Sequence, residues 1–220
     1  MSAAIKRKPG RPPVPGLVER RREEILDAAA KLFAERTYAD TDTQLLADRL
    51  GVGKGTIYRY FPTKETLFLA AVDRAMRRLS AQVQSDVAPT VDPLDRITRA
   101  IRSYLRFFEE NPNLVELLIQ ERAQFRDRKK PTYFAHRDAN VGPWKELFER
   151  LMAAGRVRRM PVRRILDTLS DVLYGTIFTN YFAGRKRSFE VQTEDVVDVF
   201  FGGILSDREH AHRKARDWEP

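Results

Sequence analysis

The residues best suited to chemistry lie in one short window, TDTQLLADRLGVGKGTIYRYFPTKETL, at residues 41–67. Its second half presents cations, hydroxyl groups and aromatic rings at positions that a small hydrophobic core does not need. These outward residues are Lys54, Thr56, Tyr58, Arg59 and Tyr60. Such side chains contact DNA phosphates and base edges, and Gly55 lets the backbone come close to a duplex. The window therefore predicts a DNA-binding surface.

Two short helices must position these side chains. The sequence predicts one helix that is capped within Thr41–Thr43 and ends near Leu50, and a second over Lys54–Tyr60. Gly51 can adopt a positive φ in the turn between them. The small core would consist of Leu46, Ala47, Leu50, Val52, Ile57 and Phe61. Two short helices that meet at such a turn are typical of the helix-turn-helix motif.

Helical periodicity continues through the rest of the chain. Apolar residues recur at helical spacing from Glu19 to about Arg36, and again from Thr63 onward. Helix-ending signals at Asn111-Pro112 and Gly155 separate the later helices, and no alternating strand pattern or internal repeat interrupts them. The sequence thus predicts an all-α fold of about nine helices, with an N-terminal three-helix head and a C-terminal helical bundle.

Residues 1–16 form a separate arm that is basic and rich in proline. Its prolines disfavour a helix and favour an extended or disordered chain. Around Arg11, residues 8–12 resemble the Gly-Arg-Pro hooks that place an arginine in the minor groove. A disordered, solubilising tail explains the same composition, and both interpretations stay open. In either case a basic arm adds nonspecific affinity for DNA.

The composition narrows the classes of protein and of partner. The chain has 220 residues and a formal net charge of +9, which favours acidic partners. Residues 1–64 hold 13 Lys and Arg against 8 Asp and Glu, so the excess charge is concentrated near the N-terminus. The lack of cysteine excludes disulfides and thiolate metal sites, and is usual in a reducing compartment such as the cytoplasm. No apolar run approaches the roughly 18 residues that a membrane-spanning helix needs, so no membrane partner is expected.

The sequence contains little that indicates a catalytic site. The histidines are His136, His210 and His212, and the last two do not share a helix face, so neither a metal site nor a catalytic triad is predicted. GVGKGT at residues 51–56 is similar to the end of a phosphate-binding P-loop, but Asp48 stands where that motif needs its first glycine. We therefore expect a protein that is not an enzyme and has no cofactor.

The same window resembles the N-terminal signature of the TetR family of bacterial transcriptional regulators. The resemblance covers about residues 19–70 and is strongest through GVGKGTIYRYFPTKETLF. The matching positions are Gly51, Val52, Gly55, Tyr58, Tyr60, Phe61, Lys64 and Leu67. Gly53 departs from the serine that usually caps the recognition helix, and Leu45 and Leu50 replace a commonly polar residue and a common alanine.

The resemblance implies a set of DNA-contacting residues within a head at residues 17–64. Thr43 and Gln44 would begin the first helix of the motif and face the operator. The recognition helix would contribute Lys54, Gly55, Thr56, Tyr58 and Tyr60. Lys64, at the start of the next helix, would hold a phosphate.

The resemblance also implies that residues 65–208 bind an inducing small molecule and form a homodimer, followed by a charged tail at residues 209–220. For the ligand pocket we expect Tyr104, Phe108, Trp144, Phe148 and Phe178. For the dimer interface we expect Leu173, Ile177, Val197, Phe200, Phe201 and Ile204, next to Gly202 and Gly203. Ordinary packing within one chain is the alternative for each of these residues.

These features together predict a ligand-responsive transcriptional regulator. Following the resemblance, it would be a repressor that binds a palindromic double-stranded DNA operator as a homodimer and is released by a small-molecule inducer. Two other classes stay open: a small helical enzyme, and a helical adaptor that binds another protein.

Overall fold

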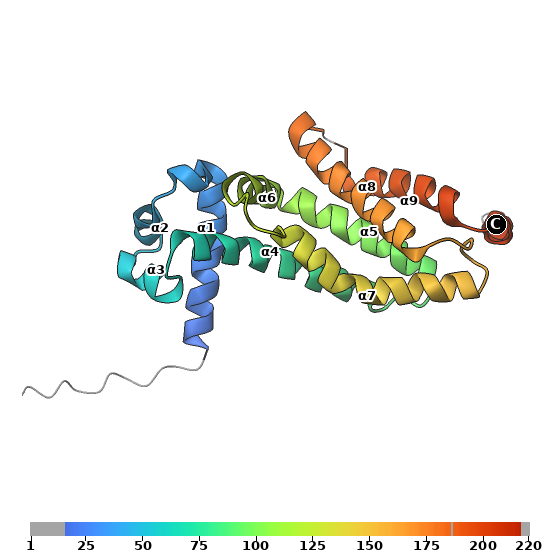
Figure 1. Ribbon diagram of the computed structural model, residues 1–220, viewed down its shortest axis with the longest axis horizontal. Coiled ribbons are helices and arrows are strands. Elements are labelled where there is room, and N and C mark those ends of the chain that lie inside the picture. The colour runs from blue at the N-terminus through green and yellow to red at the C-terminus, as the bar shows by residue number, and fades with distance from the viewer. Residues whose placement is uncertain (1–15, 186, 217–220) are drawn as a thin grey trace, which may run out of the picture.

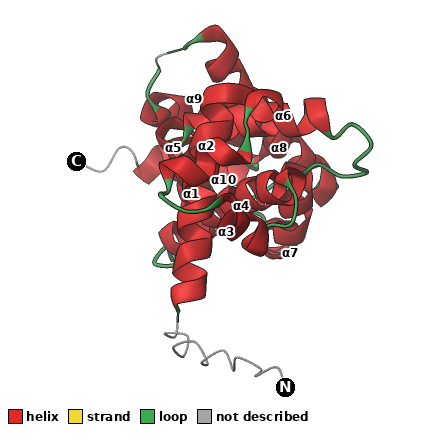
Figure 2. Cartoon of the chain, turned by 90° about the vertical axis from the view of Figure 1, so that its left-hand side faces the viewer, coloured by secondary structure: helices red, strands yellow, loops and turns green. Residues whose placement is uncertain are grey.

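Ten α-helices and no strand make up the part of the chain that the computed structural model describes, residues 16–185 and 187–216 (Figures 1 and 2). The helices are α1 (Leu17–Asp40), α2 (Thr43–Arg49), α3 (Lys54–Tyr60), α4 (Lys64–Val87), α5 (Pro93–Glu110), α6 (Pro112–Gln124), α7 (Thr132–Ala153), α8 (Val162–Ala183), α9 (Phe189–Ile204) and α10 (Asp207–Arg216). The expected all-α class is confirmed, with one helix more than the sequence indicated. Arg11 and the rest of the arm before residue 16 lie outside the described residues.

The molecule is elongated, with a head of α1, α2 and α3 at one end and the bundle of α5 and α7–α9 at the other (Figure 1). Apolar residues of α1 that recur every three or four positions are fully buried in the head, among them Ile25, Ala29 and Leu32. They pack with the buried residues of the two short helices, which include Leu46, Ala47 and Ile57. The head thus has the small core that the sequence predicted.

Helix α4 runs from the head into the bundle (Figure 1). Its N-terminus has a capping box: the Thr63 hydroxyl accepts from the backbone N–H of Thr66 at 3.0 Å, and the Thr66 hydroxyl accepts from the N–H of Thr63 at 3.0 Å. Its buried stripe continues along the helix through Leu67, Phe68, Ala71, Val72, Met76 and Leu79. One rigid helix therefore contributes to the cores of both regions.

A cluster of aromatic rings joins the head to α4 and α6. The Phe68 ring lies 5.0 Å from Phe33 and 5.2 Å from Tyr38, and Tyr38 lies 5.1 Å from Phe125. Tyr38 reaches this cluster because α1 is interrupted at Thr37, whose φ is 71°. A β-branched residue in that region is strained, and the Thr41 hydroxyl donates to the Thr37 carbonyl at 2.6 Å across the break. The interruption agrees with the predicted helix end near Arg36.

Helix α5 lies at the centre of the bundle and packs against α4 and α9. The Asp92 side chain caps it by accepting from the N–H of Leu94 at 2.8 Å, and Pro93 occupies its first position. Its buried face follows helical spacing through Ile97, Ile101, Leu105 and Phe108. Helix α5 therefore lies between α4 and α9.

The C-terminal segment is held by an arginine that bridges two carboxylates. Residues 207–216, at the expected charged tail, form α10. Arg156 donates to Asp92 at 2.7 Å and to both oxygens of Glu209 at 3.0 and 3.1 Å. Its hydrogen bond lowers the pKa of Glu209. Burial alone would raise the pKa of Asp92, but the hydrogen bonds from Arg156 and two backbone N–H groups outweigh burial and lower it.

Replacing Arg156 with Met should lower the free energy of unfolding by about 2 kcal/mol at pH 7, because Asp92 loses its cation and Glu209 keeps only Arg213, at 3.5 Å. Both carboxylates have a lower pKa in the folded state, so this stability is present above their unfolded pKa values, about 4, and is lost as the pH falls through the folded values.

Urea unfolding at pH 7 and at pH 3 measures both effects. The wild type should lose more stability than Arg156→Met between these two pH values. Arg163→Met is the matched control, because Arg163 is 92% exposed and pairs only with Asp167 one turn away. Equal pH dependence in the wild type and Arg156→Met would contradict this account of the bridge.

Candidate DNA-binding surface and ligand cavity

The turn between α2 and α3 has the geometry that the motif requires. Gly51 has a φ of 63°, in the left-handed region, and the N–H of Val52 donates to the Ala47 carbonyl at 3.0 Å. Gly53 precedes α3 with no side-chain cap, as its departure from serine predicted. The two helices are thus joined tightly, and the outer face of α3 stays open to solvent at Gly55, Tyr58 and Arg59.

An ion pair crosses from α2 to α3. Lys54 Nζ lies 2.9 Å from Asp42 Oδ1, and the same carboxylate caps α2 through the N–H of Gln44 at 2.8 Å. The hydrogen bond from Gln44 and then the one from Lys54 lower the pKa of Asp42, while Asp42 raises the pKa of Lys54. Sequence reasoning treated Asp42 only as one of three possible caps. In the structure it also orients the first cation of α3.

Thr43 is not part of the exposed surface, which corrects the expectation that it faces an operator. Its side chain is 3% exposed, and its hydroxyl pairs with the Tyr58 hydroxyl at 2.9 Å. The turn angle between the two helices directs these side chains at each other. Thr43 therefore positions Tyr58, whose ring is 38% exposed. Gln44 is exposed, and its amide donates to Asp48 at 2.7 Å.

The remaining predicted contact residues lie at the end of α3 and the start of α4. Thr56 and Tyr60 are half-buried, and the Arg59 guanidinium lies 5.5 Å from the centre of the Tyr60 ring. Lys64 Nζ donates to the Ala39 carbonyl at 3.1 Å and lies 4.6 Å from the Tyr38 ring centre. Lys64 thus ties α4 to the end of α1, a role that its motif position did not reveal. Its contact with phosphate stays a prediction.

A cavity of about 800 Å³ lies in the bundle between α4, α5, α7 and α8. Its walls are mainly apolar and include Met76, Leu79 and Val83 of α4. Of the five aromatics expected there, Tyr104, Trp144 and Phe148 line it. Phe108 and Phe178 do not: Phe108 is buried in the core, and Phe178 stacks on Tyr174 with ring centres 4.4 Å apart.

Two phenols form the main polar feature of this cavity. The hydroxyls of Tyr104 and Tyr133 lie 2.8 Å apart, and both residues line the wall. Burial raises the pKa of Tyr104 well above its ordinary value, and burial also raises that of Tyr133. Both phenols are therefore protonated at neutral pH and can each donate one hydrogen bond.

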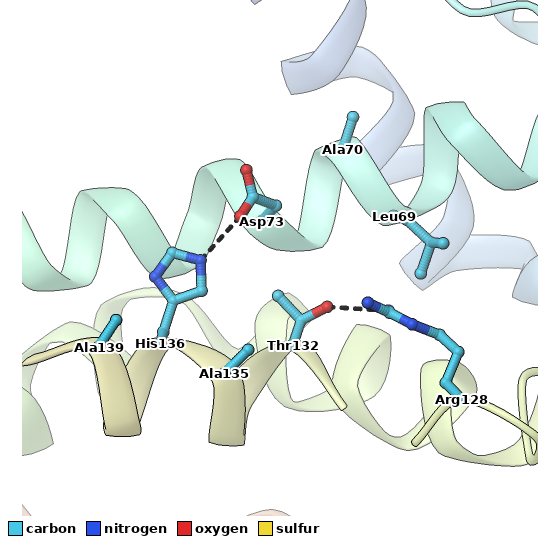
Figure 3. Close-up of a pocket in the computed structure, with 8 residues that line it drawn as sticks. All are labelled: Leu69, Ala70, Asp73, Arg128, Thr132, Ala135, His136 and Ala139. Atoms are coloured by element: carbon cyan, nitrogen blue, oxygen red, sulfur yellow. Dashed lines mark hydrogen bonds and ion pairs between the residues drawn. The ribbon is translucent and has the colours of Figure 1, made fainter. Parts of the chain in front are cut away.

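A second, smaller cavity of about 420 Å³ lies between α4 and the start of α7 (Figure 3). His136 Nε2 lies 2.8 Å from Asp73 Oδ1 across it, and Arg128 donates to the Thr132 hydroxyl at 3.1 Å. Behind them Glu121, which is 1% exposed, accepts from the Thr132 N–H at 2.9 Å and pairs with Arg128. These contacts connect α4, α6 and α7, and the contact of Asp73 with His136 joins residues 63 positions apart, which sequence spacing does not reveal.

The residues expected at a dimer interface are mostly buried within one chain, as the alternative of ordinary packing predicts. Ile177 of α8 and Phe200, Phe201 and Ile204 of α9 are between 4 and 8% exposed. Helix α9 packs against α5, which helps to bury its three residues. Leu173 and Val197 are half-buried, and Leu173 lines the large cavity. The exposed apolar residues of α8 and α9 are instead Val172, Phe182, Val191 and Val199, with Tyr181 beside them.

Comparison with known proteins agrees with the geometry of the head. A family model described as bacterial regulatory proteins of the tetR family matches residues 25–71, which span most of α1, all of α2 and α3, and the start of α4. The head of this chain is therefore similar to the N-terminal region of TetR-family regulators. The matched segment is the one that holds the helix-turn-helix and its glycine turn.

Individual curated relatives match over part of this chain. An uncharacterized HTH-type transcriptional regulator of Mycobacterium tuberculosis is 37% identical over 92 residues, which cover 42% of this chain and 46% of that protein. The HTH-type transcriptional repressor KstR of the same organism is 32% identical over 98 residues, 44% of each chain. The chain thus matches just under half the length of these curated relatives.

Solved structures extend the likeness to the whole fold. The fatty acid degradation regulator FadR from Bacillus halodurans superposes with a TM-score of 0.71 over 89% of this chain and 98% of that one, at 18% identity. The TetR-family regulator PfmR from Thermus thermophilus gives a TM-score of 0.66 at 25% identity, over 81% of this chain and 97% of that one. In the described part of this chain, every helix is too short or too polar to cross a membrane.

The two glycines of the turn allow a direct test of the local geometry. Gly51→Ala should destabilise the protein by about 1 kcal/mol, because an alanine is strained at positive φ although no atom blocks its Cβ. Gly53→Ser should instead stabilise it by about 0.3 kcal/mol by adding the missing cap of α3. Urea unfolding of both variants measures the difference, and a neutral Gly51→Ala would show that the turn does not need a left-handed residue.

Proposed function

We propose that this protein is a ligand-responsive repressor of transcription. It binds a palindromic DNA operator as a homodimer, in the cytoplasm, and a small molecule in the bundle cavity releases it. The observation that carries the proposal is the shared helix α4. Its first turns bury Leu67 and Phe68 in the head, and its later turns place Met76, Leu79 and Val83 on the cavity wall.

This arrangement supports coupling between ligand and DNA. A ligand that needs a different position of α4 at the cavity must also move the residues that α4 contributes to the head, because a packed core resists gradual deformation. The ligand can shift the equilibrium only by its differential affinity for the two states. DNA must then weaken ligand binding by the same factor.

The exposed face of α8 and α9 supports a dimer. Val172, Gly175 and Phe182 recur along α8 at intervals of three and seven residues, and Phe182 is 70% exposed. Val199 on α9 is 76% exposed, and Gly202 adds a small exposed residue one turn later. A contiguous apolar face on two neighbouring helices is suited to pairing with its own copy about a twofold axis. Two heads in such a dimer would reach successive major grooves, about 34–36 Å apart.

Relatives support both halves of the proposal. KstR is named a repressor, whereas the similar FasR of Mycolicibacterium smegmatis is named an activator, so the sign of regulation rests on the proposal. A FadR from Bacillus subtilis was solved with stearoyl-CoA, and a regulator from Saccharomonospora viridis with choline. Small-molecule binding is thus compatible with this fold for ligands of very different chemistry.

The DNA-binding surface is tested by removing one cation. Lys54→Ala should weaken binding to DNA from the region flanking the protein's own gene, and should lower the slope of log affinity against log salt by about 1, because one phosphate contact is lost. Titrations at several salt concentrations measure this slope. Lys145→Ala is the control, because it removes an exposed cation of the bundle, whose side chain is 61% exposed against 40% for Lys54. The same loss of slope in both variants would argue against a contact surface on α3.

The dimer is tested by placing a charge on its proposed face. Phe182→Glu or Val199→Glu should convert the dimer to a monomer in sedimentation experiments and reduce affinity for the palindromic operator by more than about tenfold, because a buried carboxylate without a partner is costly. Val91→Glu is the control, because Val91 is 93% exposed and lies in the loop before α5. A dimer that persists in both face variants would exclude this surface as the interface.

A further inference from the structure

One face of α5 lines the large cavity from end to end. Arg96, Ala100 and Tyr104 are spaced one turn apart and all lie on its wall. At a rise of 1.5 Å per residue, the eight steps from Arg96 to Tyr104 span about 12 Å along the helix. The cavity therefore has a cation toward one end of this face and a phenol toward the other, with apolar residues between them.

Arg96 is a cation without an acidic partner. Its Nη2 donates to the Thr90 carbonyl at 2.9 Å, while its Nε is buried and makes no hydrogen bond within the described chain. The neighbouring Asp92 is already bound by Arg156 at 2.7 Å. Arg96 also lies at the start of α5, where the helix dipole is unfavourable for a positive charge. Neither local electrostatics nor an internal ion pair explains an arginine at this position.

The other cations on the cavity wall differ from Arg96. Arg137 pairs with Asp138 at 2.9 Å, and Arg163 pairs with Asp167 at 3.2 Å. Arg150 and Lys145 each have a glutamate one turn away, at 4.0 and 3.9 Å. Within the described residues, Arg96 is thus the cation of this wall that retains donors and has no carboxylate within 4 Å. An anion from outside the chain would satisfy it.

The phenol end retains a hydrogen-bond donor. Two phenols carry two protons, and the contact between Tyr104 and Tyr133 uses one of them. One phenol proton is therefore left to donate to an oxygen acceptor in the cavity.

We propose that the cavity takes an elongated, mostly apolar carboxylic acid with a hydroxyl or carbonyl oxygen about 12 Å from its carboxylate. Arg96 holds the carboxylate, and the Tyr104–Tyr133 pair binds the distant oxygen. Cavities of this size suit small organic ligands, and the apolar wall between the two polar ends excludes strongly hydrated molecules. This inference rests on the proposed function, because it assigns the inducing ligand to the same cavity.

Three matched probes test the two ends separately: ω-hydroxydecanoic acid, decanoic acid and decanol. Their affinities for the full-length protein are measured by isothermal titration calorimetry. We expect ω-hydroxydecanoic acid to bind at least about tenfold more tightly than either of the others, because only it satisfies both ends. Arg96→Met should abolish the preference for the ω-hydroxy acid over decanol. Tyr104→Phe should abolish the preference for the ω-hydroxy acid over decanoic acid.

The control is Arg163→Met, which removes a cavity-wall arginine that has its own carboxylate and should leave all preferences unchanged. Circular dichroism checks that each variant is folded. If the wild type binds none of the probes, or if its preferences survive in both Arg96→Met and Tyr104→Phe, the inference is overturned.

Operator binding by the same samples separates this inference from the proposed function. A protein that binds operator DNA but shows no preference among the probes retains the proposed function and refutes the ligand class. A protein that shows the predicted preferences but binds no DNA supports the ligand class and refutes the repressor.

Discussion

The structure depends on one constraint: α4 must satisfy two cores at once. Phe68 packs against the rings of Phe33 and Tyr38 in the head, and Met76 and Leu79 form part of the cavity wall about two and three turns later. A sharp kink between these points would break backbone hydrogen bonds of the helix. Any change in the cavity that displaces α4 is therefore transmitted to the head, and the glycine turn and ion pairs of the head move with it.

The contacts that hold α4 to its neighbouring helices determine how α4 can be displaced. Its N-terminus is held by the capping box and by Lys64, whose ammonium binds the end of α1. Further along α4, the Asp73 carboxylate makes a hydrogen bond with His136 of α7, and Arg74 forms ion pairs with Glu23 and Asp27 of α1. The polar groups in these contacts can form hydrogen bonds with water instead, whereas the aromatic rings have no such alternative. We therefore expect the polar contacts to break and form again when α4 is displaced, while the aromatic cluster moves as a unit.

The sequence was sufficient to predict features that depend on local spacing. The all-α class, the helix-turn-helix, the positive φ of Gly51 and the missing cap at Gly53 all follow from neighbouring residues. It was insufficient where the partner of a side chain decides its role. Thr43 pairs with Tyr58, and Phe200 is buried beside Phe148 of α7. An apolar pattern predicts that a face is covered but not what covers it, and α10 is held by Arg156 from a distant loop.

Coupling between the cavity and the head through α4 is tested most directly by filling the cavity with a larger side chain in place of a ligand. Ala100 lies on the cavity wall at the middle of the α5 face, so Ala100→Trp would occupy the space beside α4. Operator affinity of this variant is the measurement, with folding checked by circular dichroism. The account predicts that the folded variant binds operator DNA about tenfold more weakly or worse, in the range typical of allosteric coupling. Unchanged operator affinity in a folded Ala100→Trp variant would contradict coupling through α4.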